Sequence, residues 1–374
     1  MRQARLAGHD ATLLLLSEPS GWLDEVSGLR LESLRLKPLD PETPRVLVQW
    51  LANHPQDLLL LNGIDEADPA IPYLPSGVRC VYAVHDTAQR YWKSALEHEK
   101  DLSAIVAVSQ TVARQFADRL EDKSKLHVIH NGSLLPALPD TPKKRADDLI
   151  FLGGSVPAKG AYDLLSAWPV LVARGFNGRL HCFGNLEEAF EARIRKLPEA
   201  ERITIYGRTR REVIFEQAAV AKILLMLSRV EPFGMATVEA MGMGCVPIAW
   251  DIDTGTKEIA TAESGVFVPL GDFEQLAREA LRVCAEHEKY ESAVIQRARQ
   301  SFSENVMWDG YAKLFTDLMS RPAHTVSLAG ERAASFVPAT RFFQLLPAPV
   351  RAAIRNWVGR SARLGYLFRD LRGR

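Results

Sequence analysis

Two carboxylates stand in the otherwise apolar segment SRVEPFGMATVEAMGMGCVPIAWD, which spans residues 228–251. Glu231 lies directly before Pro-Phe-Gly, and Glu239 follows eight positions later among small and apolar residues. A charge is rarely kept in apolar surroundings without a partner, because removing it from water is costly. Either acid alone is typical of a surface position, but the two together, with Phe-Gly between them, favour a functional role.

The residues after Phe-Gly are predicted to form a helix that begins near Gly234 or Met235. The first amide groups of a helix have no partner within it and carry the positive end of the helix dipole. Phosphate or sugar oxygens are suitable partners for such a helix end. Glu239 falls about one turn into this helix, from where its long side chain can reach the same space.

The elements that must position these groups follow from an alternation of short apolar runs and longer amphipathic stretches. In the first half of the chain, strands are predicted at 12–17, 57–62, 79–85, 104–108 and 126–130. Helices are predicted in that half at 45–54, 87–100 and 110–120. In the second half, strands are predicted at 149–153, 180–184, 203–207, 222–228, 246–250 and 265–269.

This alternation indicates parallel sheets that helices cover on both faces. We therefore expect an α/β fold with two tandem doubly wound, Rossmann-like domains that face a cleft. Ligands of such sheets bind at the carboxyl ends of the strands. Because Glu231 follows the strand 222–228 by a few residues, it is expected at the rim of the cleft.

Composition excludes several classes of protein. Lys plus Arg and Asp plus Glu both number 46, so no overall positive field points to nucleic acid. Apolar runs such as TLLLL are strand-length and fall short of the ~20 residues that a membrane-spanning helix needs. The four cysteines, Cys80, Cys182, Cys245 and Cys284, are far apart and lack metal-ligand spacing, which indicates free thiols in a cytoplasmic protein.

The pattern Glu-x-Phe-Gly-x4-Glu-Ala-Met-x2-Gly-x-Val-Pro at 231–247 resembles the signature of the retaining nucleotide-sugar glycosyltransferases of family 4, which have the GT-B fold. In that family the first Glu contacts hydroxyls of the donor sugar, and the second binds the ribose hydroxyls of the nucleotide. The resemblance therefore implies that Glu231 holds the sugar and that Glu239 holds the ribose. The amides of the residues that follow Phe233 would line the sugar and the diphosphate.

A second segment, LIFLGGSVPAKGAYDLLSAW at 149–168, resembles the strand, loop and helix that carry the diphosphate-binding lysine of the family. Lys159 matches that lysine. The arginine that is usual in the loop is replaced by Gly154, and the candidates to supply the missing charge are Arg208 and Arg210 in YGRTRRE.

In the first half of the chain, VYAVHDTAQRYW resembles a strand of the family that ends in a histidine before a helix. His85 would then lie across the cleft, near the sugar and the acceptor. The alternative is a histidine that merely ends a strand. Asp86 is expected to be the N-cap of the next helix.

The resemblance thus implies a set of site residues. Those assigned to catalysis are Glu231, His85 and Lys159. Those assigned to donor binding are Gly153, Gly154, Ser155, Lys159, Arg208, Glu231, Phe233, Gly234, Met235, Ala236, Thr237 and Glu239. No metal site and no cofactor beyond the donor substrate is expected. Asp-Ile-Asp at 251–253 has the spacing of a metal-binding motif but comes after the signature helix.

The resemblance covers roughly residues 5 to 318, and it sets the expected domain boundaries. These are an acceptor-side domain at 1–136, a linker at 137–148, a nucleotide-sugar-binding domain at 149–305, a closing helix at 306–320 and a basic amphipathic tail at 321–374. The first strand and glycine-rich loop of the family should precede ARLAGHDATLLLL, and we expect the first domain to be incomplete there.

The function implied is transfer of a sugar from a nucleoside diphosphate sugar to the hydroxyl of a sugar or lipid-linked acceptor, in the assembly of polysaccharide, lipopolysaccharide or glycolipid. The alternative is a non-catalytic sugar-nucleotide-binding or scaffold protein that degenerated from this family. A nucleotide-sugar epimerase on the same fold is a weaker alternative within enzymes.

The end of the chain, residues 341–374, carries eight arginines and one acid. Its arginines alternate with apolar residues, including Trp357 and Phe368, at near-helical spacing. Such a stretch suits the surface of an anionic membrane. The alternative is a tail that folds against the first domain with its arginines in water.

Overall fold

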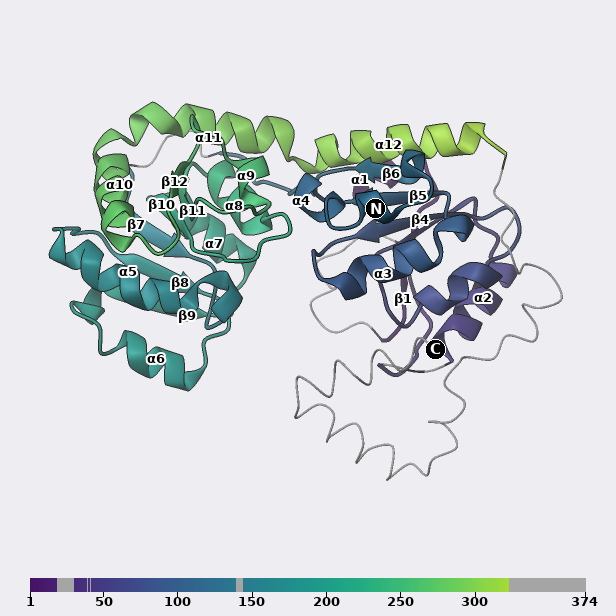
Figure 1. Ribbon diagram of the computed structural model, residues 1–374, viewed down its shortest axis with the longest axis horizontal. Coiled ribbons are helices and arrows are strands. Elements are labelled where there is room, and N and C mark those ends of the chain that lie inside the picture. Colours follow the sequence, from purple (N-terminus) through teal and green to yellow (C-terminus); the bar gives the residue numbers. More distant parts are fainter. Residues whose placement is uncertain (19–29, 39, 41, 139–143, 323–374) are drawn as a thin grey trace, which may run out of the picture.

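The computed structural model describes residues 1–18, 30–38, 40, 42–138 and 144–322, which form two α/β lobes (Figure 1). The N-terminal lobe contains strands β1 to β6, and the C-terminal lobe contains strands β7 to β12. Helix α12 (Glu304–Ser320) leaves the C-terminal lobe after α11 and lies along the N-terminal lobe. The expected architecture of two parallel sheets with covering helices is confirmed.

The main sheet of the N-terminal lobe is parallel, with the order β3-β4-β5-β6. Its strands are β3 (Leu58–Leu61), β4 (Arg79–Val84), β5 (Ala104–Ala107) and β6 (Leu126–Val128). A separate parallel pair is formed by β1 (Thr12–Leu15) and β2 (Arg30–Ser33), of which β2 was not predicted. The helices of this lobe are α1 (Arg2–Leu6), α2 (Thr43–Asn53), α3 (Gln89–Glu97) and α4 (Gln110–Ala113).

The sheet of the C-terminal lobe is parallel and six-stranded, with the order β12-β11-β10-β7-β8-β9. Its strands are β7 (Ala146–Phe151), β8 (Leu180–Phe183), β9 (Ile203–Gly207), β10 (Ala221–Met226), β11 (Val246–Trp250) and β12 (Val266–Val268). The helices are α5 (Ala161–Ala173), α6 (Glu188–Ile194), α7 (Arg211–Ala218), α8 (Met235–Gly242), α9 (Thr256–Ile259), α10 (Phe273–Glu286) and α11 (Glu288–Ser301).

The central strand β10 shows why this sheet has to be covered on both faces. Ile223 and Leu225 point to the face that α5 and α10 cover, whereas Leu224 and Met226 point to the face of α7 and α8. Successive side chains of a strand alternate between faces, so an unbroken apolar run needs two apolar layers. Burial of this strand therefore fixes the middle of the lobe.

The prediction of a helix at 110–120 is correct for the first turn only and wrong for the residues after it. The α-helix ends at Ala113, and a short 3-10 turn follows at Ala117–Arg119. Phe116 leaves the helical conformation, with φ −139° and ψ −8°, and its buried ring stacks on Trp92 at 6.3 Å between centroids. Packing of one aromatic side chain thus outweighs the helical pattern of the sequence.

The helix predicted at 87–100 begins at Gln89 rather than Thr87. Its N-cap is Ala88, which offers no side-chain hydrogen bond, so the expected capping role of Asp86 is wrong. The Asp86 carboxylate instead accepts a hydrogen bond from the amide of Ala88 at 2.9 Å and stabilises the turn before the helix.

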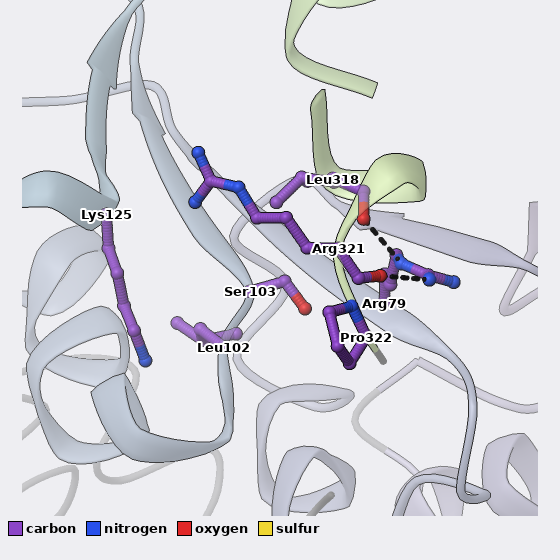
Figure 2. Close-up of a pocket in the computed structure, with 7 residues that line it drawn as sticks. All are labelled: Arg79, Leu102, Ser103, Lys125, Leu318, Arg321 and Pro322. Carbon is purple, nitrogen blue, oxygen red and sulfur yellow. Dashed lines mark hydrogen bonds between the residues drawn. The ribbon is translucent and has the colours of Figure 1, made fainter. Parts of the chain in front are cut away.

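Helix α12 ties the two lobes together. Leu314 and Leu318 pack against Val81 and Val106 on one face of the N-terminal sheet. At the C-terminal end of the helix, Arg79 donates hydrogen bonds to the carbonyl oxygens of Leu318 at 2.8 Å and Arg321 at 2.7 Å, as Figure 2 shows. A guanidinium group suits this place because the last carbonyl groups of a helix lack partners within it.

Asp68→Asn is expected to remove a pH-dependent loss of stability in the N-terminal lobe. Asp68 is buried, and its carboxylate accepts a hydrogen bond from the Tyr82 hydroxyl at 2.7 Å. Burial raises the pKa of Asp68 from 3.8 to about 6, although hydrogen bonds from Ser94 and Tyr82 oppose the rise. The neutral acid is favoured in the folded state, so its contribution to the free energy of unfolding is complete below pH 3.8 and is lost as the pH rises through 6.

The size of the loss should be about 3 kcal/mol, since one pKa unit corresponds to about 1.4 kcal/mol. Urea unfolding at pH 4, 5, 6 and 7 measures this loss. The unfolding free energy of the Asp68→Asn variant should gain on that of the wild type as the pH rises. Asp57→Asn, at an exposed position, is the control for the charge change. A gain that stays constant over this pH range would contradict the prediction.

Candidate functional site

The strand order of the C-terminal sheet reverses between β7 and β10. From β7 the chain moves outward to β8 and β9, and β11 and β12 are added on the other side of β10. The connections after β7 and β10 therefore diverge, which leaves a crevice at the carboxyl ends of these two strands. The loop after β7 carries Lys159, and the loop after β10 carries Glu231. The sheet topology thus places both residues at the expected ligand position.

Lys159 and Glu231 form an ion pair at this crevice. The Nζ atom of Lys159 lies 2.9 Å from Oε1 and 2.7 Å from Oε2 of Glu231. The side chain of Glu231 is 9% exposed, whereas that of Lys159 is 39% exposed. The acid is therefore a largely buried group that depends on its cation, and the lysine remains accessible to an anion from the cleft.

The N-terminus of α8 opens into the same crevice. Gly234 is its N-cap, with φ +116°, and no side chain caps the helix. A Cβ atom at Gly234 would meet Ile259 Cδ1 and Thr237 Oγ1 at 3.2 Å, so both the space and the backbone conformation favour glycine. The first amides of α8 consequently stay available for oxygen atoms of a ligand.

His85 reaches the cleft from the N-terminal lobe, directly after β4. Its Nε2 atom lies 3.1 Å from Oδ1 of Asn62, which follows β3. Burial lowers the pKa of His85, so the neutral ring is favoured. With Asn62 Oδ1 as the acceptor, Nε2 carries the proton and Nδ1 keeps a lone pair for a hydroxyl donor.

These groups surround a cavity of about 330 Å³ between the lobes. It is large enough for part of a small polar ligand. Eight of the predicted site residues line it: His85, Gly153, Lys159, Glu231, Phe233, Gly234, Met235 and Ala236. Asp86, Asn131 and Ser228 add polar groups that the sequence did not suggest.

Gly154 and Ser155 do not line the cavity, because their loop turns toward the loop after β8. The amide of Ser155 donates to the carbonyl oxygen of Asn185 at 3.0 Å. Gly154 has φ +54°, and a Cβ atom there would lie 2.5 Å from the Asn185 oxygen. The expected arginine is thus absent at a position that this backbone reserves for glycine.

Arg208 and Arg210, the candidates for the missing cation, are exposed and do not line the cavity. The arginine that reaches the signature helix is Arg211, which donates to Oε1 of Glu239 at 2.7 Å. Glu239 itself lies one turn beyond the cavity, with its side chain 16% exposed. Thr237 is buried, and its hydroxyl has no hydrogen-bond partner among the described residues.

A contact between the lobes that was not predicted from the sequence centres on Glu258 in α9. Its carboxylate accepts hydrogen bonds from the amides of Gln110 at 2.8 Å and Thr111 at 2.7 Å, and it lies 3.0 Å from Nε2 of His130. Burial raises the pKa of Glu258, but the hydrogen bonds outweigh that effect and bring the pKa to about 2. A carboxylate that follows the signature segment could have been noticed, but its partners lie more than 100 residues away.

A second link between the lobes joins the signature loop itself to the N-terminal lobe. The Ser109 hydroxyl donates to the carbonyl oxygen of Pro232 at 2.5 Å. Pro232 stands between Glu231 and Phe233, so the relative placement of the lobes and the shape of the crevice depend on each other.

The acids of the Asp-Ile-Asp motif are engaged with basic side chains rather than with each other. Asp251 pairs with Lys257, and Asp253 pairs with Arg114 at 2.7 Å. Among the described residues, no group of three or more His, Cys, Asp or Glu side chains could hold a metal ion.

Within the part of the chain that the structure describes, no helix has the length and apolar character needed to cross a membrane. All four cysteines are buried and free, as expected.

Glu258→Gln should weaken the contact between the lobes, because a neutral amide oxygen is a poorer acceptor and an amide group cannot serve two N–H donors with both of its polar atoms. The expected loss is at least about 2 kcal/mol of unfolding free energy at pH 7, since hydrogen bonds to a charged group are involved. The folded pKa of Glu258 lies below 4.5, so the stabilisation is present above pH 4.5 and is lost as the pH falls toward 2.

Chemical unfolding of the wild type and the variant at pH 7, 5, 4 and 3 gives this difference directly. Glu201→Gln, an exposed acid of the same lobe, controls for the lost charge. If the difference between wild type and Glu258→Gln were as large at pH 3 as at pH 7, the ionised carboxylate would not be the source of the contact.

Comparisons with known proteins agree with this geometry. The family profile described as "Glycosyltransferase Family 4" matches residues 1–133, and that described as "Glycosyl transferases group 1" matches residues 146–286. Phosphatidyl-myo-inositol mannosyltransferase of Mycolicibacterium smegmatis is 26% identical over 372 residues, which cover 87% of this chain and 88% of that protein.

Solved structures share the fold at low sequence identity. HepE of Anabaena, solved with UDP and glucose, has a TM-score of 0.67 and 19% identity and covers 85% of this chain and 94% of its own. A glycosyltransferase from Rickettsia africae has a TM-score of 0.67 and 15% identity, with coverage of 86% and 93%. The GT-B arrangement of two lobes is therefore confirmed, and the chain belongs to the glycosyltransferases that join a family 4 N-terminal domain to a group 1 C-terminal domain.

Proposed function

We propose that this glycosyltransferase is a retaining, metal-independent hexosyltransferase that moves a sugar from a nucleoside diphosphate sugar to an acceptor hydroxyl. The observation that carries the proposal is the Lys159–Glu231 ion pair beside the N-terminus of α8, at the point where the strand order reverses. A cation and helix amides suit a diphosphate, and a buried carboxylate suits sugar hydroxyls.

In the proposed transfer, the bond between C1 of the sugar and the diphosphate oxygen breaks, and the diphosphate keeps the electron pair. The acceptor oxygen forms the new bond to C1, and its proton passes to an oxygen of the departing diphosphate. Lys159 and the first amides of α8 would stabilise the charge that develops on the leaving group. When Lys159 turns to the diphosphate, Glu231 would be released to accept hydrogen bonds from the sugar.

Retention through a covalent intermediate would need a carboxylate directed at C1 of the sugar. Within the described lining of the cavity, the acids are Asp86 and Glu231. Glu231 is held by Lys159, and Asp86 accepts a hydrogen bond from the Ala88 amide. We therefore favour attack from the same face that the diphosphate leaves, and we assign no nucleophile. Neutral His85 would bind a sugar or acceptor hydroxyl across the cleft.

The proposed acceptor is a sugar or a lipid-linked sugar of the cell envelope, used at the cytoplasmic face of the membrane. The name of the mannosyltransferase relative, which refers to phosphatidyl-myo-inositol, supports a lipid-linked acceptor. The competing hypothesis of a non-catalytic binding protein predicts nucleotide binding without turnover. The two hypotheses separate when donor consumption and nucleotide affinity are measured on the same preparation.

Glu231→Gln and Glu239→Gln are expected to affect different steps. Glu231→Gln should lower turnover by at least 100-fold, on the order of 3 kcal/mol of transition-state stabilisation. Its affinity for free nucleoside diphosphate should stay within about threefold of the wild type, because Lys159 loses its competing partner. Glu239→Gln should weaken nucleotide binding by about 1.5–3 kcal/mol, the range for a hydrogen bond to a charged group.

The measurement uses calorimetry with UDP, GDP and ADP, and it follows release of nucleotide from a panel of UDP- and GDP-sugars with a sugar acceptor. Glu288→Gln, an exposed acid on α11, is the matched control. Equal nucleotide affinities in the two site variants would remove the assignment of sugar and ribose. Binding without any turnover by the wild type would favour the non-catalytic alternative.

The basic tail at 341–374, which lies outside the described residues, is proposed to contact anionic lipid. Its eight arginines against one acid would supply the attraction, and Trp357 and Phe368 would supply apolar area. Deletion of 341–374 should abolish sedimentation with vesicles that contain 30% phosphatidylglycerol and leave the melting temperature unchanged. About 0.5 M salt should release the full-length protein, because the charges are exposed. A truncated protein that aggregates or melts early would favour packing against the first domain instead.

A further inference from the structure

Arg211 occupies an unfavourable place for a cation unless it has partners. It is the first residue of α7, where the positive end of the helix dipole repels a positive side chain. Its Cζ atom lies 4.9 Å from the centre of the Phe215 ring, so the side chain folds back along its own helix. The guanidinium group then meets two acceptors from distant parts of the chain.

The first acceptor is Glu239 of α8, whose Oε1 atom lies 2.7 Å from Nη2 of Arg211. Within the described residues, no hydrogen bond reaches Oε2 of Glu239. A carboxylate offers about four lone-pair positions, so one oxygen can be held while the other still accepts from a ligand. Glu239 follows Ala236, which lines the cavity, by about one turn of helix.

The second acceptor is the hydroxyl of Ser133, which takes a hydrogen bond from the same Nη2 atom of Arg211. Ser133 is 1% exposed and lies between β6 of the N-terminal lobe and β7 of the C-terminal lobe, where the chain passes from one lobe to the other. It pairs with Ser303, where the chain returns, and its amide donates to the carbonyl oxygen of Phe302 at 2.9 Å. Arg211 therefore links Glu239 to the crossing point of the lobes.

Each of the two acids near the crevice is paired with a cation, which supports a role for Arg211 beside Glu239. A diphosphate brings negative charge to a crevice that is lined by Glu231 and that has Glu239 one helix turn beyond it. Lys159 neutralises the first acid, and Arg211 neutralises the second. Without Arg211, the carboxylate of Glu239 would have no fixed orientation.

We infer that Arg211 is a positioning residue of the donor site, which holds the Glu239 carboxylate in place for the nucleotide ribose and anchors it to Ser133 at the crossing of the lobes. This inference rests on the proposed role of Glu239. Arg211 acts through that carboxylate and does not itself touch the ligand. Its effect should therefore appear on the nucleoside part of the donor and disappear when Glu239 is neutral.

The test compares binding of the tightest of UDP, GDP and ADP with binding of inorganic pyrophosphate at 0.15 M salt. Arg211→Met should raise the dissociation constant of the nucleoside diphosphate about tenfold and that of pyrophosphate less than twofold. Arg211→Lys should restore at least half of the loss on a logarithmic scale, because an ammonium group can still pair with Glu239. Arg195→Met, which removes an exposed cation directly after α6, should change neither constant.

A double-mutant cycle separates positioning from direct contact. In the Glu239→Gln background, Arg211→Met should weaken nucleotide binding by less than twofold further. Ser133→Ala should weaken it two- to threefold in the wild-type background and not at all beside Arg211→Met. Additive losses, or an equal loss for pyrophosphate, would show that Arg211 acts on the ligand directly and would overturn the inference. If Arg211→Met fails to fold, Arg211→Lys and Ser133→Ala give the same cycle.

The same measurements distinguish failure of the proposed function from failure of the inference about Arg211. If the wild type bound none of the three nucleotides, or if Glu239→Gln left the affinity unchanged, the donor-site assignment would fail and the inference with it. If Glu239→Gln weakened binding while Arg211→Met left it within twofold of the wild type, the inference about Arg211 would fail by itself.

Discussion

The reversal of strand order between β7 and β10 is the constraint on which the site depends. Two adjacent parallel strands whose connections run in opposite directions leave their following loops side by side at one edge of the sheet. Here the amide of Arg229, after β10, donates to the carbonyl oxygen of Ala158, after β7, at 2.8 Å. This backbone hydrogen bond holds the loops together, and it brings Lys159 and Glu231, 72 residues apart, into bidentate contact.

The arrangement of charges at this edge overcomes a difficulty that the proposed donor site would otherwise face. Carboxylates bind hydroxyl groups well, but they repel a diphosphate, and burial without a partner is costly. Each of the two signature acids therefore meets a cation from another element. The lysine comes from the loop before α5, and the arginine comes from the start of α7.

The loop after β10, which lines the crevice, also contacts the N-terminal lobe. Ser109 from the N-terminal lobe holds the carbonyl group of Pro232, and Glu258 receives the first amides of α4 together with His130. The chain crosses between the lobes at Ser133 and Ser303, which lie next to each other. A change in the angle between the lobes would therefore alter the contacts of Pro232, which lines the crevice, and of the Ser133–Arg211–Glu239 link, which lies beyond it.

The sequence by itself determined the class of fold, the two-lobe organisation and half of the residues that line the crevice. Apolar runs such as 222–228 are readable because a strand buried on both faces must be apolar throughout. The spacing of Glu231, Gly234 and Glu239 is local, since one loop and one helix turn fix it. Features of this kind depend on neighbours in the chain, so the sequence can predict where they lie, while the ligand roles assigned to these residues stay predictions.

The tertiary structure decided everything that depends on partners distant in sequence. The ion pair of Lys159, the choice of Arg211 over Arg208 and Arg210, and the contact of Glu258 with the other lobe all join segments far apart in the chain. The three arginines at 208, 210 and 211 cannot be distinguished in the sequence. Only the position at which α7 begins directs Arg211, and not the other two, toward Glu239. The glycine at position 154 is likewise explained only by the tertiary structure, in which a Cβ atom at Gly154 would lie 2.5 Å from the carbonyl oxygen of Asn185. Steric exclusion and charge pairing act through space, so residue order along the chain could not reveal them.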